Sequence, residues 1–253
     1  MRFRILVKGM PLFVFLRKMP TFLFEYREIR RQGEKAGGGF PFATFYPCLQ
    51  ERDQESGVIA EHYFHQDLLI AQKIFLNHPE RHVDIGSRID GFVAHVASFR
   101  EIEVFDVRDL HLDIANIRFT RADLMNREFP FADYCDSLSC LHALEHFGLG
   151  PYGDPLDYQG HLRGWENMHR ILKPGGKFYF SVPIGEQRIE FNAHRVFSVA
   201  YLLSLMEGHY AVDSFSYIND EQKLITGAAL DKEAVENNFG CHYGCGIFEL
   251  TKR

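Results

Sequence analysis

The stretch that decides the fold runs from Phe129 to Pro183. It opens with Phe129-Pro-Phe-Ala-Asp-Tyr-Cys-Asp-Ser-Leu-Ser-Cys-Leu-His-Ala-Leu-Glu-His146 and closes with Met168-His-Arg-Ile-Leu-Lys-Pro-Gly-Gly-Lys-Phe-Tyr-Phe-Ser-Val-Pro183. Its apolar runs predict buried strands at 136–140 and 177–182. Between them, 159–172 predicts a helix that Lys173-Pro-Gly-Gly176 stops. The stretch is therefore a strand-helix-strand unit with ionisable groups in its middle.

The alternation of strands and helices continues on both sides of this unit. Helices are expected at 61–77, 92–99 and 196–206, and strands at 82–86, 102–105, 117–120, 212–218 and 246–250. This order favours a parallel sheet with helices on both faces. The sequence therefore predicts an α/β fold with a doubly wound, mostly parallel, seven-stranded Rossmann-like sheet. Ligands of such a sheet bind at the carboxyl ends of the strands.

Composition narrows the class of protein. A chain of 253 residues is long enough for one α/β domain and an extension. Gly37-Gly-Gly39 marks a joint, so we expect an N-terminal arm at 1–40 and a domain at 41–253. The net charge of −6 argues against a nucleic-acid partner. Five cysteines without a signal peptide indicate reduced thiols and a cytoplasmic protein.

Two cysteines near the end of the chain raise the question of a metal. Cys241 and Cys245 flank His242, but no second ligand pair stands at a usual spacing. The favoured interpretation is buried cysteines beside the last strand, where a free thiol acts as a small apolar group.

Residues 1–24 are apolar and basic. Lys8, Arg17, Lys18 and two prolines interrupt the apolar run, so it is too short to span a membrane. Two interpretations stay open. The segment packs on its own domain or on a second subunit of a homo-oligomer, or it lies on a membrane surface, which would make the protein peripheral on the inner face.

Acidic and glycine residues follow the first three predicted strands. Asp84, Gly86, Ser87 and Gly91 stand at the end of the first, and Asp106 ends the second. A carboxylate in the position of Asp106 suits the two hydroxyls of a ribose. Asp123 follows the third strand. These residues are the candidate cofactor-binding set.

The stretch 129–183 and these strand ends resemble class I S-adenosylmethionine (SAM)-dependent methyltransferases. The resemblance implies that SAM is the cofactor, with Asp84 near its amino group and Asp123 near its adenine. In that family two further glycines follow Gly86, where this chain has Arg88 and Asp90. A side chain as large as Arg88 would fill space that the donor needs, unless the loop is remodelled.

Histidines gather after the fourth and fifth predicted strands. His142, Glu145 and His146 share one helical face, and His194 should approach the same rim. The run resembles the metal-using small-RNA 2′-O-methyltransferases, which implies a divalent metal on His142, Glu145, His146 and His194. Imidazole with carboxylate suits Mn²⁺, Fe²⁺ or Zn²⁺ better than Mg²⁺. A catalytic His146 or His194 without metal, and a purely structural role, are the alternatives.

A loop rich in glycine and proline, 147–157, follows His146. Its glycines would let it cover a ligand, and Asp154 could accept hydrogen bonds from sugar hydroxyls. Asp154 is therefore a third catalytic candidate, although a solvated connection explains the loop equally well.

From Tyr63 to Leu250 the chain resembles the family catalogued as domain of unknown function 268. The matching residues are His82-Val-Asp-Ile-Gly-Ser-Arg-Ile-Asp-Gly91, Leu141-His-Ala-Leu-Glu-His-Phe-Gly-Leu-Gly150 with Tyr152-Gly-Asp154, and Asn192-Ala-His-Arg195. The resemblance implies an altered first glycine loop and a surface-polysaccharide context. We therefore expect O-methyl transfer from SAM to a sugar or glycan intermediate. The alternative is a relative without methyl transfer, a scaffold subunit or a nucleotide-sugar enzyme.

Overall fold

The computed structural model describes residues 12–37, 39–42, 47–49, 61–111 and 113–253. The chain forms two compact units, Met1–Ile59 and Ala60–Arg253. The domain boundary expected at residue 40 stays a prediction, because residues 50–60, beside the division between the units, lie outside the described residues.

The described part of the first unit is dominated by one helix, α1 (Leu12–Lys35), which continues through Pro20. Its second half carries paired charges, such as Arg31 and Glu28 at 2.6 Å between Nη2 and Oε1. None of the helices in the described ranges is long and apolar enough to cross a membrane. Residues 1–11 lie outside these ranges, so a membrane or subunit contact of 1–24 stays a prediction.

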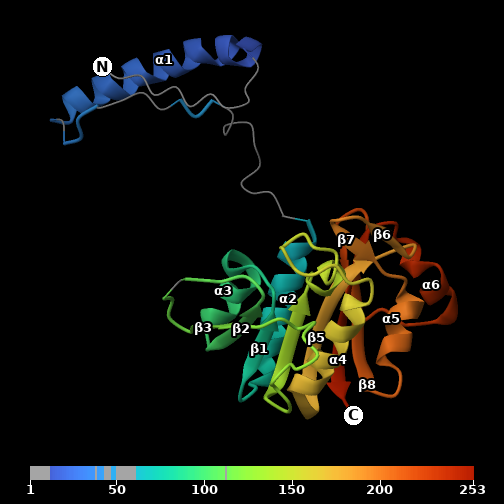
Figure 1. Ribbon diagram of the computed structural model, residues 1–253. Coiled ribbons are helices and arrows are strands. Elements are labelled where there is room, and N and C mark those ends of the chain that lie inside the picture. The colour runs from blue at the N-terminus through green and yellow to red at the C-terminus, as the bar shows by residue number, and fades with distance from the viewer. Residues whose placement is uncertain (1–11, 38, 43–46, 50–60, 112) are drawn as a thin grey trace. The chain divides into compact units, whose positions relative to one another are not determined.

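The second unit is built on one eight-stranded sheet (Figure 1). Its strands, in spatial order, are β3 (Ile117–Arg121), β2 (Ile102–Asp106), β1 (His82–Ile85), β4 (Cys135–Leu141), β5 (Leu172–Ile184), β10 (Gly244–Lys252), β8 (Tyr210–Ile218) and β9 (Leu224–Ile225). The first five are parallel, and β10, β8 and β9 pair antiparallel. The predicted mostly parallel Rossmann-like sheet is confirmed. The two-residue β9 adds an eighth strand to the seven predicted.

Helices cover both faces of this sheet. They are α2 (Glu61–Asn77), α3 (Ala94–Ala97), α4 (Gly160–Ile171), α5 (Val199–Met206) and α6 (Lys232–Glu236), with single turns η2 (Ile89–Val93), η3 (Leu144–His146) and η4 (Asn238–Gly240). A short hairpin of β6 (Arg188–Glu190) and β7 (His194–Val196) follows β5. The hairpin lies at the upper edge of the domain in Figure 1, where the parallel strands end.

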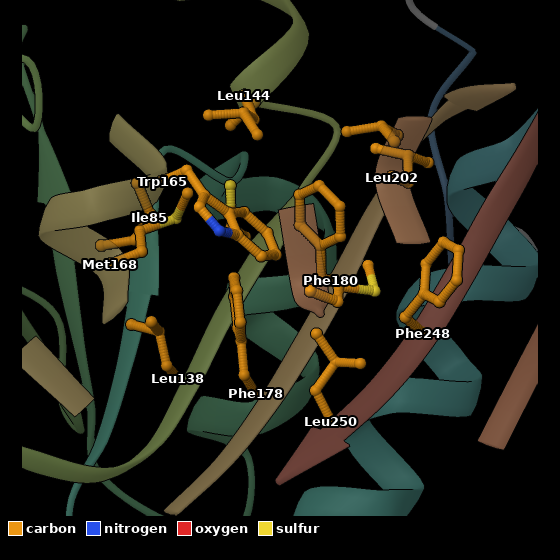
Figure 2. Packing of buried hydrophobic residues seen from close by; sticks show 14 of the residues in the cluster. Ile85, Leu138, Leu144, Trp165, Met168, Phe178, Phe180, Leu202, Phe248 and Leu250 are labelled. Atoms are coloured by element: carbon orange, nitrogen blue, oxygen red, sulfur yellow. The ribbon is translucent and has the colours of Figure 1, made fainter. Parts of the chain in front are cut away.

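Alternation along β5 divides the core into two layers. Phe178 and Phe180 are fully buried in the layer that includes Trp165 of α4 (Figure 2). Tyr179, which points the other way, is buried in the layer that includes Ile70 and Ile74 of α2. Burying each Phe side chain stabilises the fold by about 1.5–3 kcal/mol. A strand buried on both faces reads as a continuous apolar run, which is why the sequence revealed it.

Candidate functional site

A pocket opens at the edge where the parallel strands end. Its walls come from the turn after β1, the ends of β2 and β3, the turn after β4, and the loop that follows η3. Six of the predicted site residues line it: Gly86, Asp106, Asp123, His142, His146 and Asp154. The other five, Asp84, Ser87, Gly91, Glu145 and His194, do not line it. The structure thus gathers much of the predicted cofactor and histidine sets around one cavity.

Gly86 forms the tight turn at the bottom of the pocket. Its φ of +72° lies in the left-handed region that suits glycine. A Cβ atom at this position would stand 3.2 Å from the Cβ of Ala143, across the turn after β4. The turn therefore needs glycine for conformation and for space, and the bare backbone of Gly86 faces the pocket.

Asp84 supports that turn from inside the protein. The residue is fully buried, and its Oδ1 accepts hydrogen bonds from the Ser139 and Ser87 hydroxyls at 2.5 and 2.8 Å. Its Oδ2 accepts the Ser87 backbone N–H at 2.9 Å. Burial raises the pKa of Asp84 to about 6, although these bonds favour the charged form. Both oxygens are engaged within the protein, so Asp84 holds the turn, and its contact with a donor stays a prediction.

Arg88 and Asp90, which stand where glycines were expected, leave the pocket open. Arg88 does not line the cavity. Its guanidinium forms an ion pair with Asp90 at 2.9 Å, and the two side chains are 70 % and 73 % exposed. Gly91 packs close to α2, because a Cβ there would stand 2.9 Å from the Oδ2 of Asp67. The loop is remodelled into η2, and Arg88 points to solvent instead of filling donor space.

Asp106 stands at the end of β2, where a ribose would be expected, but an arginine already engages it. Arg108 reaches Asp106 with Nη2 to Oδ2 at 2.6 Å and Nε to Oδ1 at 3.0 Å. The Arg108 backbone N–H also donates to Oδ1, at 2.8 Å. The Tyr152 ring lies over the guanidinium, 4.4 Å from its central carbon. A sugar whose two hydroxyls donate to Asp106 therefore competes with this guanidinium.

Asp123 begins the segment after β3. Its Oδ1 accepts the backbone N–H of Met125 at 2.8 Å, which closes a local turn. This turn places 122–125 along the pocket wall, opposite the Gly86 turn. Asp123 thus lines the pocket, and its contact with a cofactor stays a prediction.

His142 and Glu145 form a buried pair at the floor of the histidine cluster. His142 adopts a φ of +51°, which non-glycine residues rarely adopt. Its Nδ1 lies 2.8 Å from Oε1 of Glu145, whose side chain is 2 % exposed. Burial opposes a charge on either group, but attraction to His142 leaves the pKa of Glu145 lowered. Likewise, burial opposes the imidazolium, yet Cys245 and Glu145 raise the pKa of His142 to about 10.

His146 stands above this pair and faces the pocket. Its Nδ1 lies 2.6 Å from the Ala193 carbonyl oxygen. A carbonyl only accepts hydrogen bonds, so Nδ1 carries a proton and donates it here. Nε2 lies 3.8 Å from Glu145 Oε1, and the Tyr152 ring meets the imidazole edge-to-face at 5.4 Å. In its neutral form, His146 therefore presents Nε2 as the basic nitrogen, and its catalytic role stays a prediction.

His194 lies on β7, outside the pocket wall. Its ring centroid is 6.4 Å from that of His146. Its Nε2 lies 3.2 Å from Oε2 of Glu190, but without the alignment of a hydrogen bond. Across the described residues, the four side chains predicted to hold a metal do not bring their ligand atoms to one point.

The loop after η3 is held by its own backbone contacts. Asp154 accepts backbone N–H groups of Gly148, Gly150 and Tyr152 at 3.0, 3.3 and 3.3 Å. Buried Arg195 donates to the carbonyl oxygens of Phe147 and Tyr158, at 2.7 and 3.1 Å. Asp154 thus organises the loop, and its proposed catalytic role receives no support from these contacts.

Sequence reasoning missed two residues beside the predicted site. Arg108 gave no signal, because an exposed arginine two residues after a strand is common. Cys245 was interpreted as a buried thiol, and Cys241 and Cys245 are indeed 7 % and 0 % exposed. The neighbours of Cys245 in space, His62 and His142, lie far from it in the sequence. Only the fold brings these three residues together.

Comparisons with known proteins identify the family and the fold. Residues 96–241 match the model of a family described as "Caenorhabditis protein of unknown function, DUF268". No curated protein matches the sequence.

Solved structures with similar folds include a cyclase and an N-methyltransferase. The [4+2]-cyclase SpnF aligns with a TM-score of 0.54 and 14 % identity, over 87 % of this chain and 91 % of that one. The N-methyltransferase NodS from Bradyrhizobium japonicum WM9, in complex with S-adenosyl-l-homocysteine, aligns with a TM-score of 0.50 and 12 % identity over 82 % and 93 %. YcgJ from Bacillus subtilis aligns with a TM-score of 0.50 and 16 % identity, over 75 % of this chain and 98 % of that one. At these identities the likeness shows the fold alone. Because the family model covers more than half of the chain, the protein belongs to the DUF268 family, and its domain has the class I SAM-dependent methyltransferase fold.

Proposed function

We propose that the protein transfers a methyl group from SAM to a hydroxyl of a sugar or surface-glycan intermediate. One observation carries the donor assignment. A single pocket is lined by Gly86, Asp106 and Asp123, which follow three neighbouring parallel strands. The crevice at the carboxyl ends of such strands is where open α/β sheets bind ligands. NodS, which has this fold, was solved with the demethylated donor, S-adenosyl-l-homocysteine.

His146 is the residue that we assign to proton removal. The acceptor oxygen attacks the methyl carbon as the bond between that carbon and the sulfonium breaks, and the hydroxyl proton passes to Nε2 of His146. A positioned base contributes about 10²–10⁴-fold to such a step, and in-line placement of the two reactants contributes the rest. The bond from Nδ1 to Ala193 fixes the ring with Nε2 as the basic nitrogen.

Three partly exposed tyrosines support a sugar as the acceptor. Tyr63, Tyr152 and Tyr243 are 39 %, 46 % and 37 % exposed. Their rings lie 5.2 Å from His142, 5.4 Å from His146 and 5.3 Å from His194. An aromatic ring offers a flat apolar surface and a tyrosine adds a hydroxyl, which together suit the faces and hydroxyls of a pyranose. The net charge of −6 disfavours nucleic acid as the acceptor.

Isothermal titration with SAM and S-adenosylhomocysteine tests the donor assignment. We expect micromolar binding of both. With binding established, transfer of a radiolabelled methyl group to a panel of nucleotide sugars and simple glycosides tests the acceptor class. His146→Ala should lower transfer by about 10²–10⁴-fold with donor affinity unchanged. His209→Ala, at an exposed position after the end of α5, should change neither.

One observation favours the alternative without methyl transfer. The pairing of Asp106 with Arg108 occupies the ribose position, and SpnF is named a cyclase although it shares the fold. If neither SAM nor S-adenosylhomocysteine binds, the proposal fails, and titration with a nucleotide sugar becomes the next measurement.

A further inference from the structure

Three side chains from distant parts of the chain meet beside the pocket. His62 lies in the first turn of α2, His142 in the turn after β4, and Cys245 near the start of β10. One nitrogen or sulfur atom from each lies within 4.8 Å of those of the other two. Within the described part of the chain, no other group of three His, Cys, Asp or Glu side chains comes as close.

The strand register explains the meeting. The His142 backbone N–H donates to the Ser181 carbonyl of β5 at 3.0 Å. Cys245 pairs with Pro183, two residues further along β5. Neighbouring strands thus bring His142 and Cys245 to the same edge, and α2 places His62 over them. The His62 and His142 rings stack at 5.3 Å between centroids, with 19° between their planes.

The three groups are buried, and both histidines are incompletely bonded. His62, His142 and Cys245 are 5 %, 9 % and 0 % exposed. The Nε2 atoms of both histidines are buried without a hydrogen-bond partner. Buried polar atoms normally have a partner, so two such nitrogens beside a buried thiol require an explanation. A bound cation supplies one, because it would accept a lone pair from each ring and from the thiolate.

The surroundings of His142 match those of a metal-bound imidazole. Its Nδ1 donates to Oε1 of Glu145 at 2.8 Å, which leaves Nε2 as the nitrogen that would give up its proton to bind an ion. Ligand histidines usually bond a carboxylate or a carbonyl through their other nitrogen, which fixes the ring and strengthens the metal bond. Glu145 therefore acts as a positioning residue.

We propose that His62, His142 and Cys245 bind one zinc ion. Imidazole and thiolate are zinc ligands in proteins, and three protein ligands leave a fourth position for water or a substrate oxygen. Thiolate disfavours Mg²⁺ and Ca²⁺, which prefer oxygen. The ligand set shares only His142 with the four residues predicted from the sequence. His142 also lines the donor pocket, so the ion lies at the border of that pocket. The site does not depend on methyl transfer.

The test is zinc binding by the full-length protein without any donor. Protein stripped with a chelator and titrated with Zn²⁺ should bind one ion, and Co²⁺ in its place should give the charge-transfer absorption of a cobalt–thiolate bond. Cys245→Ser should remove that absorption and weaken zinc binding at least about 100-fold. His62→Ala should also weaken it strongly, and Glu145→Gln should weaken it about 10–100-fold.

Cys241→Ser is the matched control. Cys241 is also buried, lies four residues before Cys245, and is outside the trio, so its variant should bind zinc and cobalt as the wild type does. Circular dichroism of each metal-free variant shows whether it folds, and Glu145→Gln, which keeps the side-chain shape, supplies the test if Cys245→Ser does not. Absence of zinc binding in the wild-type protein, or an unchanged cobalt spectrum in folded Cys245→Ser, overturns the proposal. Because SAM is absent, failure here is separate from failure of donor binding.

Discussion

Removing the Arg108 side chain should strengthen donor binding. In the free protein the Arg108 guanidinium engages both oxygens of Asp106 and lies against Tyr152. The Arg108 side chain is 51 % exposed and that of Asp106 13 %. A pair this exposed contributes about 0.2–1 kcal/mol, and the aromatic contact about 0.5–1 kcal/mol at an exposed site. A ribose that hydrogen-bonds Asp106 must first displace interactions worth about 1 kcal/mol.

Arg108→Ala removes that competitor and leaves Asp106 in place, because the backbone N–H of residue 108 still donates to it. A difference of about 1 kcal/mol is about fivefold in Kd, and we expect tighter SAM binding by this factor in isothermal titration. Arg121→Ala is the control. Arg121 forms a similar exposed pair with Asp109, at 3.0 Å, and does not line the pocket. Unchanged or weaker SAM binding by Arg108→Ala refutes the reasoning and indicates that Arg108 itself contacts the donor or that the ribose binds elsewhere.

Two further predictions concern the loop after η3 and the turn after β1. Gly148→Ala places a Cβ 2.0 Å from the Asp157 carbonyl oxygen, whereas Gly153→Ala meets open space at a similar φ. Gly148→Ala should therefore disrupt the loop and abolish transfer, and Gly153→Ala should cost about 1–2 kcal/mol at most; equal loss in both would contradict this. Because burial raises the pKa of Asp84 to about 6, the folded protein holds this proton more tightly than the unfolded chain. The associated stability is present below about pH 4 and is lost as pH rises through 6. Asp84→Asn should lack this pH dependence. In urea unfolding, the difference in free energy of unfolding between wild type and Asp84→Asn should therefore change by roughly 2–3 kcal/mol between about pH 4 and pH 7. If that difference stays constant, Asp84 is ionised throughout.

The sheet could be predicted from the sequence because its signals are local. The buried central strands are short runs of small and apolar residues, clearest in β5, and the helices between them show helical spacing. The ends of parallel strands meet at one edge of a sheet, so the order of the strands alone was enough to place Gly86, Asp106 and Asp123 around a common pocket.

The remaining features depend on contacts between distant residues. Arg88 was expected to fill donor space unless the loop is remodelled, and the structure shows the remodelled case, with Arg88 paired to Asp90 beside η2. No helix was predicted over α1, because its apolar residues stand in runs and Pro20 interrupts them. His146 and His194 were grouped by position along the chain, and their rings do lie 6.4 Å apart, but His194 pairs with Glu190 while His146 bonds the Ala193 carbonyl. Sequence spacing predicts which residues share an edge but not how their side chains pair.

His142 links the two halves of the site. It lines the donor pocket with Gly86 and His146, and its ring faces His62 and Cys245 behind that wall. Glu145 lies between the two histidines, 2.8 Å from His142 and 3.8 Å from His146. An ion on His142 would fix that ring, and with it the carboxylate of Glu145 that also lies beside His146. Zinc binding should therefore alter how Glu145 is shared between the two histidines, and the rate of transfer measured with and without zinc would show that coupling.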